Sequence, residues 1–166
     1  MTETQLAVAS TSHTVIVRVI GRGDFLPAQD LKTYSNKLLN SSSQELENIV
    51  IELSGCETMD STFMGILAMI GIQGRSRFKL TILNASPKLH QLLSEIGVDR
   101  LWKFAESDIN TQSWDIIHQA LSRNVPDDKL IGKTVLEAHE TLMNLDKANI
   151  PKFQNVVDLL KTQLGN

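Results

Sequence analysis

The chain has 166 residues, of which 42% are hydrophobic and 21% are charged. This is ordinary for one globular domain with an appendage, and the length is enough to bury a core. The net charge of −3, with no local basic stripe, argues against a nucleic-acid-binding protein.

Membrane and secreted proteins are also disfavoured. No apolar run approaches the roughly 20 residues of a membrane-spanning helix. Residues 1–12 are polar and lack the charged start and apolar block of a secretory signal. Cys56 is the single cysteine and cannot form an internal disulfide, which fits a reducing compartment. We therefore expect a cytoplasmic protein.

Apolar spacing predicts alternating strands and helices after a flexible tail at residues 1–10, although Val8 is compatible with an earlier short strand. The expected strands are 13–20, 49–53, 79–83 and 101–104. The expected helices are 27–39, 62–73, 86–96 and 114–121. This alternation is typical of an α/β layer fold with a partly parallel central sheet.

Residues 123–166 follow a different pattern. A linker around residues 125–128 precedes two helical segments, which Pro151 separates. The apolar seams are Ile131, Val135, Ala138, Leu142 and Leu145 in the first segment, and Phe153, Val157, Leu160 and Leu164 in the second. The spacing of 3 and 4 residues predicts a helical hairpin. Its apolar faces must pack on each other, on the domain or on another chain.

Motifs for catalysis, cofactors and metals are incomplete. Residues 21–23 lack the third glycine of a dinucleotide site, and residues 71–74 lack the Lys-Ser/Thr of a phosphate loop. His139 begins a zinc-protease pattern, but Met143 stands where the second histidine belongs, and we expect all four histidines at the surface. Ser61 has no nucleophile elbow and no base nearby in sequence. We expect neither a cofactor nor an enzyme.

The most informative stretch joins the strand at 49–53 to the helix at 62–73. Asp60, Ser61 and Thr62 lie where a loop enters this helix, which is apolar almost all round. Asp60 or Ser61 is suited to cap the helix, because both residue types accept hydrogen bonds from orphan N–H groups. The triplet is therefore either a helix cap, a functional site or both. Cys56 is expected to pack beneath the loop as a small core residue.

Two segments resemble the STAS domain of bacterial anti-sigma factor antagonists. Glu52-Leu53-Ser54-Gly55-Cys56 matches the strand end Asp/Glu-Leu-Ser-Gly-Val, and Asp60-Ser61-Thr62-Phe63-Met64-Gly65 matches the helix entry Asp-Ser-Ser/Thr-Gly-Leu-Gly. The likeness covers residues 11–122. The chain departs from the family pattern at Phe63, where glycine is usual, and at Cys56, where valine is usual. Phe63 bears on partner identity more than on the fold.

The resemblance implies a STAS-like mixed central sheet flanked by helices, followed here by the helical hairpin. It implies a non-catalytic adaptor in which a partner serine kinase with an ATP-binding domain, often the anti-sigma factor itself, phosphorylates Ser61. A metal-dependent phosphatase of the PP2C type would restore the serine. The unphosphorylated form would capture the kinase and free its target. Thr62 is the secondary acceptor, and residues Asp60 to Met64 are the expected partner-binding residues.

A helix start suits such a switch, because its free N–H groups and dipole favour a phosphate. We expect the partner to dock on exposed Phe63 and Met64, with Asp60 adding repulsion after phosphorylation. The alternative is a structural STAS scaffold that forms a homodimer or larger assembly through its C-terminal helices, with Ser61 only a helix cap. A hydrolase that uses Ser61 ranks far below both.

Overall fold

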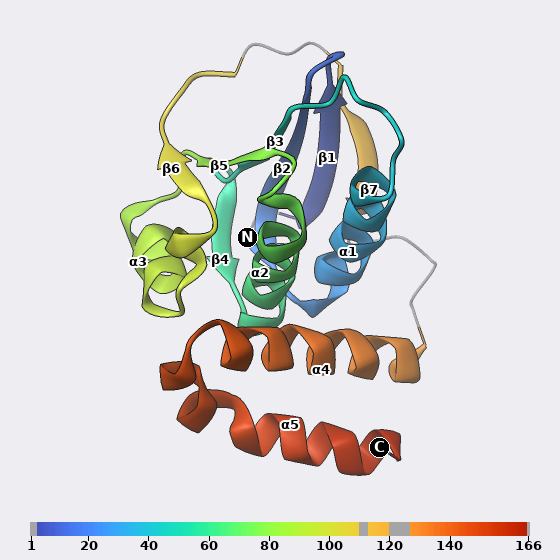
Figure 1. The fold of residues 1–166 in the computed structure, drawn as a ribbon, viewed down its shortest axis with the longest axis vertical. Helices are drawn as coiled ribbons and strands as arrows, with labels where there is room; N and C mark the ends of the chain where they lie inside the picture. Colours follow the sequence, from blue (N-terminus) through green and yellow to red (C-terminus); the bar gives the residue numbers. More distant parts are fainter. Residues whose placement is uncertain (1–2, 110–112, 120–126, 166) are drawn as a thin grey trace.

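A mixed β-sheet forms the centre of the domain (Figure 1). The computed structural model describes residues 3–109, 113–119 and 127–165. The strands within these ranges are β1 (Gln5–Ser10), β2 (Thr14–Gly23), β3 (Asn48–Glu52), β4 (Cys56–Met59), β5 (Lys79–Leu83), β6 (Lys103–Ala105) and β7 (Asp115–Gln119). The strand order is β6-β5-β3-β2-β1-β7, and β4 pairs with the end of β2.

The sheet is parallel from β6 to β2 and antiparallel from β2 to the opposite edge at β7. β2, β3, β5 and β6 run in one direction, whereas β1 pairs antiparallel with both β2 and β7. Ile51 lies at the centre of the parallel part, opposite Val17 on one side and Ile82 on the other. All three side chains are buried, as expected of strands covered by helices. The predicted mixed α/β sheet is therefore confirmed.

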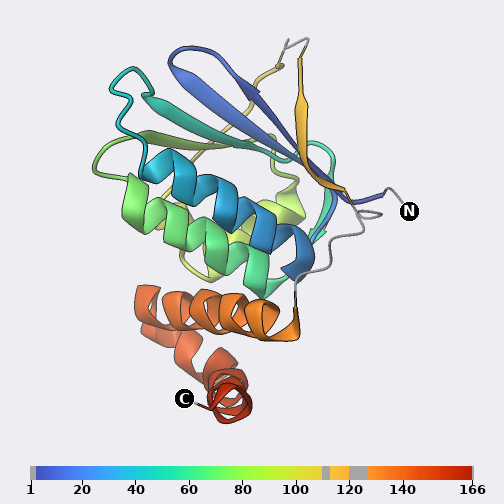
Figure 2. The same cartoon turned by 90° about the vertical axis from the view of Figure 1, so that its right-hand side faces the viewer.

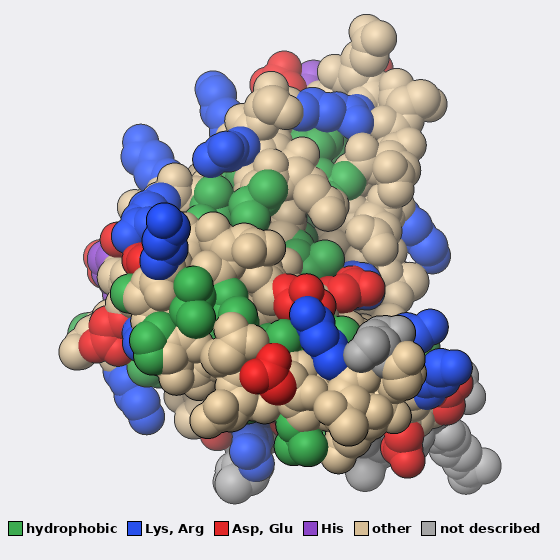
Figure 3. Space-filling view, turned by 60° about the horizontal axis from the view of Figure 1, so that its bottom comes forward, with side chains coloured by type: hydrophobic (Ala, Val, Ile, Leu, Met, Phe, Trp, Pro, Cys, Tyr) green, Lys and Arg blue, Asp and Glu red, His purple; other side chains and the backbone are tan. Residues whose placement is uncertain are grey.

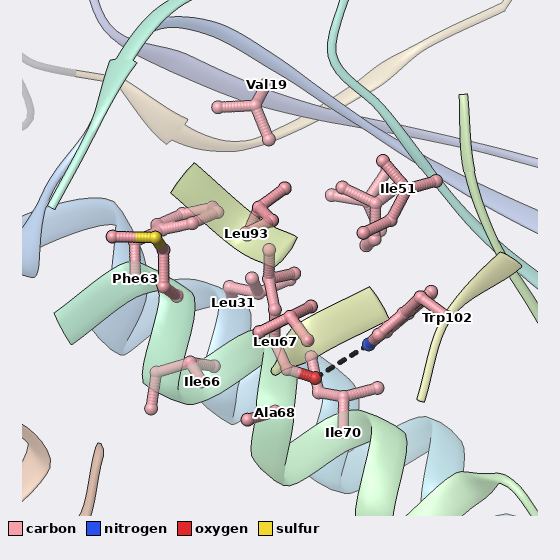
Figure 4. Packing of buried hydrophobic residues seen from close by; sticks show 14 of the residues in the cluster. Val19, Leu31, Ile51, Phe63, Ile66, Leu67, Ala68, Ile70, Leu93 and Trp102 are labelled. Carbon is pink, nitrogen blue, oxygen red and sulfur yellow. Dashed lines mark hydrogen bonds between the residues drawn. The ribbon is translucent and has the colours of Figure 1, made fainter. Parts of the chain in front are cut away.

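The helices α1 (Phe25–Leu39) and α2 (Ser61–Gly74) lie side by side on one face of the sheet (Figure 2). The helix α3 (Pro87–Glu95) and the short 3-10 helix η1 (Val98–Arg100) follow β5. Most of α2 is buried, as its apolar composition predicts. The indole N–H of Trp102 donates to the carbonyl oxygen of Leu67 at 2.8 Å and fixes α2 against the segment before β6 (Figure 4).

The C-terminal residues form the predicted helical hairpin, made of α4 (Asp128–Leu145), the 3-10 helix η2 (Lys147–Asn149) and α5 (Ile150–Leu164). α4 crosses the ends of α1 and α2, and α5 packs on the outer side of α4 (Figures 1 and 2). The apolar faces therefore pack both on each other and on the domain. None of the described helices is long and apolar enough to cross a membrane.

Three predictions of secondary structure are wrong. The helix expected at residues 114–121 is the strand β7, and residues 120–121 lie outside the described residues. Ile117 packs against the core whereas Ile116 is 49% exposed, which is the two-residue period of a strand. The apolar spacing in this segment is compatible with a helix as well as a strand. Pairing with the edge of β1 favours the strand.

The flexible tail expected at residues 1–10 is contradicted from Gln5 onward. β1 occupies residues 5–10 and lies between β2 and β7, with Leu6 fully buried. The strand β4 was expected to be a loop. Of the linker expected around residues 125–128, residues 125–126 lie outside the described residues, whereas Asp127 caps α4 and Asp128 is its first residue.

The position of β1 makes the stability of the fold depend on Leu6. We expect Leu6→Ala to lower the free energy of unfolding by about 2–5 kcal/mol, because it leaves a cavity in the core. Gln5→Ala on the same strand should cost less than about 1 kcal/mol, because Gln5 is only partly buried. Urea denaturation measures both. Equal, small losses would contradict a structural role for this strand.

Candidate functional site

The candidate site lies where β4 enters α2. The N–H of Asp60 donates to the carbonyl oxygen of Gly23 at 2.9 Å, which ties the junction to the end of β2. The carboxylate of Asp60 accepts the N–H of Phe63 at 2.9 Å and caps the helix. Asp60 is therefore the cap, and the hydroxyl of Ser61 is left for another contact.

The surroundings of Asp60 disfavour negative charge. Burial raises the pKa of the Asp60 carboxyl, and the nearby Asp24 carboxylate raises it further. Hydrogen bonds from the N–H groups of Phe63 and Thr62 and the field of His139 compensate only in part. We expected these N–H groups to be free for a phosphate. That expectation is wrong, because Asp60 already accepts them.

Ser61 forms a hydrogen bond with His139 of α4, 78 residues further along the chain, with 2.8 Å between Oγ and Nε2. His139 Nδ1 lies 2.6 Å from the carbonyl oxygen of Val135. Since a carbonyl can only accept, Nδ1 carries a proton, and in the neutral tautomer this leaves Nε2 as the acceptor. In this tautomer the hydroxyl of Ser61 donates to Nε2.

His139 is 4% exposed and meets the ring of Phe153 of α5 edge-on, with 5.1 Å between the ring centroids. The expectation that this histidine lies at the surface is wrong. Its place beside Ala138, a residue of the apolar seam, was the available signal. The partner across the interface could not be found from the sequence, because it depends on how the hairpin docks.

A hydrogen-bonded serine and histidine are also the core of a hydrolase site, but the surroundings lack its other parts. A carbonyl rather than a carboxylate orients His139. On the first turn of α2, the N–H groups of Phe63 and Thr62 donate to Asp60 and are not available to an oxyanion. Within the described part of the chain, no cluster of three or more histidine, cysteine or acidic side chains could hold a metal ion.

The remaining predicted partner-binding residues are buried in this conformation. Phe63 is fully buried, Thr62 is 4% exposed and Met64 is 7% exposed. The expected exposure of Phe63 and Met64 is therefore wrong. The ring of Phe63 points into the core (Figure 4) and lies against Gly23, where an added Cβ would come within 3.3 Å of it. Phe63 thus fills space under the end of β2, and its role toward a partner stays a prediction.

The α4 backbone covers the first turns of α2. A Cβ added at Gly65 would lie 2.5 Å from the carbonyl oxygen of Ala138 and 2.6 Å from its Cβ. Only a glycine permits so close an approach of two helix backbones. The hairpin is thus packed directly beside Ser61.

The first motif segment has a structural role. Glu52 is fully buried, and its carboxylate accepts from Arg18 Nε at 2.8 Å, the N–H of Ser54 at 2.8 Å and Asn84 Nδ2 at 3.2 Å. Burial alone would raise the pKa of Glu52, but these hydrogen bonds outweigh it, and the pKa lies below its ordinary value. Cys56 is buried as predicted, and burial raises the pKa of its thiol to about 11. The carboxylate of Glu52 therefore holds the β3–β4 turn in place through the N–H of Ser54.

A family model described as "Mlab, STAS domain" matches residues 6–103, which is more than half of the chain. The chain belongs to the STAS domain family. The match ends before the α4–α5 hairpin, which is outside the part of the chain that the family model covers. A search of curated proteins gives no match.

Solved structures agree on the fold of this STAS domain. The anti-sigma factor antagonist SpoIIAA in its unphosphorylated form superposes with a TM-score of 0.51 at 18% identity, over 64% of this chain and 89% of that chain. An anti-sigma factor antagonist from Mycobacterium paratuberculosis gives 0.51 at 20% identity, over 63% and 85%. The resemblance predicted from the two motif segments is confirmed at the level of family and fold.

The raised pKa of Asp60 predicts a pH dependence. The folded protein binds this proton more tightly than the unfolded chain, so the contribution of Asp60 to stability is full below its unfolded pKa of about 3.9. It is lost as the pH rises through the folded-state pKa. Asp60→Asn keeps the capping oxygen and removes the charge. We expect the variant to lose less stability than wild type over this pH range.

Urea denaturation at several pH values measures the difference. Asp99→Asn, at an exposed carboxylate of η1, is the control and should follow wild type. If Asp60→Asn also shows the wild-type pH dependence, the carboxyl of Asp60 does not titrate above its ordinary value.

Proposed function

We propose that this STAS protein is a non-catalytic adaptor of the anti-sigma factor antagonist type, switched off by phosphorylation of Ser61. The observation that carries the proposal is that Ser61 is not the helix cap. Asp60 caps the first turn of α2, so the partly buried hydroxyl of Ser61 is not needed to cap its own helix. A modification there would leave the fold of the STAS domain intact.

The charges around Ser61 support a switch. A phosphate adds about −1.5 to −2 charges. Asp60 and Asp24 already repel each other at this end of α2, and the first-turn N–H groups donate to Asp60. A partner covering this surface would have to desolvate the phosphate beside Asp60. A loss of about 3 kcal/mol would weaken its binding about a hundredfold.

The proposed partners are a serine kinase with an ATP-binding domain, which binds the unphosphorylated form, and a PP2C-type phosphatase, which restores it. The partner surface is centred on Asp60 and Ser61. Thr62 is a weaker acceptor than Ser61, because its side chain is buried. Phe63 and Met64 lie beneath this surface and position it by packing under the first turn of α2. No catalytic group or cofactor of this chain is needed, since the kinase supplies both.

Ser61→Ala and Ser61→Asp test the proposal together. We expect immobilised Ser61→Ala to retain a kinase with an ATP-binding domain, identified by mass spectrometry, and Ser61→Asp to bind it about a hundredfold more weakly. With ATP, this kinase should phosphorylate wild type but not Ser61→Ala. Ser86→Asp is the matched control, because Ser86 also begins a helix and aspartate preserves its cap. Equal labelling of wild type and Ser61→Ala would contradict the assignment of Ser61.

A second candidate function is self-association through α5. Among the described residues, Val156 is 39% exposed and Leu159 is 59% exposed on this helix. Figure 3, which views the molecule from the hairpin end, shows hydrophobic side chains at the surface between charged ones. This exposure favours the scaffold alternative, although not its premise that Ser61 is only a helix cap.

Leu159→Lys tests the self-association. If α5 mediates a dimer, sedimentation should show a monomer for Leu159→Lys and a dimer for wild type. Gln91→Lys places the same charge on exposed α3 and should not change the mass. A monomeric wild type at all concentrations would rule this function out.

A further inference from the structure

The α4–α5 hairpin is fastened across the domain by polar contacts at several points. At one end, Thr134 of α4 donates to the side chain of Gln29 of α1, and both residues are buried. At the other end, Asn149 Nδ2 donates to the carbonyl oxygens of Ile96 at 3.0 Å and Leu142 at 2.8 Å. The hairpin is therefore seated on the STAS domain in one defined position.

Between these ends, α4 lies over the first turns of α2. Ser61 donates to His139 at 2.8 Å, and one turn further on the backbone of Ala138 covers Gly65. The salt bridge from Lys32 of α1 to Glu137 lies beside them. Ser61 is thus the one residue of the proposed switch whose side chain bonds directly to the hairpin.

We propose that the hairpin is a lid over Ser61, closed by the Ser61–His139 hydrogen bond and opened by phosphorylation. This inference rests on the proposed function of Ser61 as the phosphorylated residue. Oγ and Nε2 are in hydrogen-bond contact, so no phosphoryl group fits between them. The phosphorylated serine and the docked α4 exclude each other.

The charge of the phosphate, like its size, favours release of the hairpin. In the neutral tautomer Nε2 of His139 is an acceptor, because Nδ1 donates to Val135. Phosphate oxygens are acceptors as well, so this tautomer gives them no donor at Nε2. The carboxylate of Asp60 adds repulsion, and its capping role keeps it in place. Repulsion from Asp60 therefore adds to the steric exclusion of a phosphate at Ser61.

Opening changes which surfaces a partner can reach. It uncovers the small-residue patch at Gly65 on α2 and the face of α4 that carries Ala138, His139 and Leu142, all buried in the closed state. A kinase must displace α4 to reach Ser61, and after transfer the phosphate prevents α4 from docking again. The hairpin thereby competes with the kinase before the reaction and becomes available to other proteins after it.

Hydrogen exchange tests the lid without a kinase. Phosphoserine is incorporated at position 61 of the full chain during synthesis, and exchange is followed by mass spectrometry. We expect amides of α4 to exchange at least tenfold faster than in wild type, while β3 and β5 are unchanged. Phosphoserine at position 86, an exposed residue at the start of α3, is the control and should leave α4 protected. Unchanged protection of α4 with phosphoserine at 61 would overturn the lid.

Gly65→Ala tests whether a loosened hairpin gives the kinase easier access to Ser61. The new Cβ meets the α4 backbone, so the variant should loosen the hairpin while alanine favours the helical state of α2. We expect the kinase captured by Ser61→Ala to phosphorylate Gly65→Ala at least tenfold faster than wild type. His139→Ala, which removes the acceptor, should act in the same direction. Gln73→Ala, at an exposed position of α2, is the control.

The outcomes separate the two proposals. Equal phosphorylation rates for wild type, Gly65→Ala and His139→Ala would overturn the lid and leave the switch at Ser61 intact. Absence of Ser61 labelling in wild type and in both variants would overturn the proposed function. In that case the hydrogen-exchange experiment alone decides whether a phosphate at position 61 releases the hairpin.

Discussion

The architecture depends on burying two apolar faces of α2. Its residues are apolar almost all round, so burying one face against the sheet leaves a second apolar face toward solvent. α4 covers that face, and Gly65 allows the two backbones to approach closely. The hairpin is therefore part of the packing of the domain, and what lies at the start of α2 is covered with it.

The electrostatics of the site follow from this packing. Burial and the nearby Asp24 disfavour the charged form of Asp60 and raise its pKa. The hydrogen bond from the N–H of Phe63 nevertheless holds the Asp60 side chain at the helix start. Ser61 is thereby released from capping and donates to His139. At this interface the side chains of Asp60, Ser61 and His139 each have a hydrogen-bond partner within the protein. Such an interface tolerates added negative charge poorly, which is the property that a phosphorylation switch requires.

Sequence reasoning succeeded where the signal is local. The strand Lys79–Leu83 and the helices around Ser61 and Pro87 were predicted nearly to the residue, because hydrophobic period, caps and turn residues agree there. It failed at β1 and β7, whose strands are defined by their pairing with each other and with β2. Short segments such as these carry too few residues for the helical and strand periods to be told apart.

For the site, the sequence alone was enough to identify the STAS family and to place Asp60, Ser61 and Thr62 at a helix start. These depend on residue types at fixed spacing along one segment of chain. The folded structure was needed to show that Asp60 is the cap, that Phe63 faces the core and that Ser61 contacts His139. Each of these depends on which surface α2 turns toward the sheet and which toward α4. That choice is made by packing between segments far apart in sequence, and no local pattern encodes it.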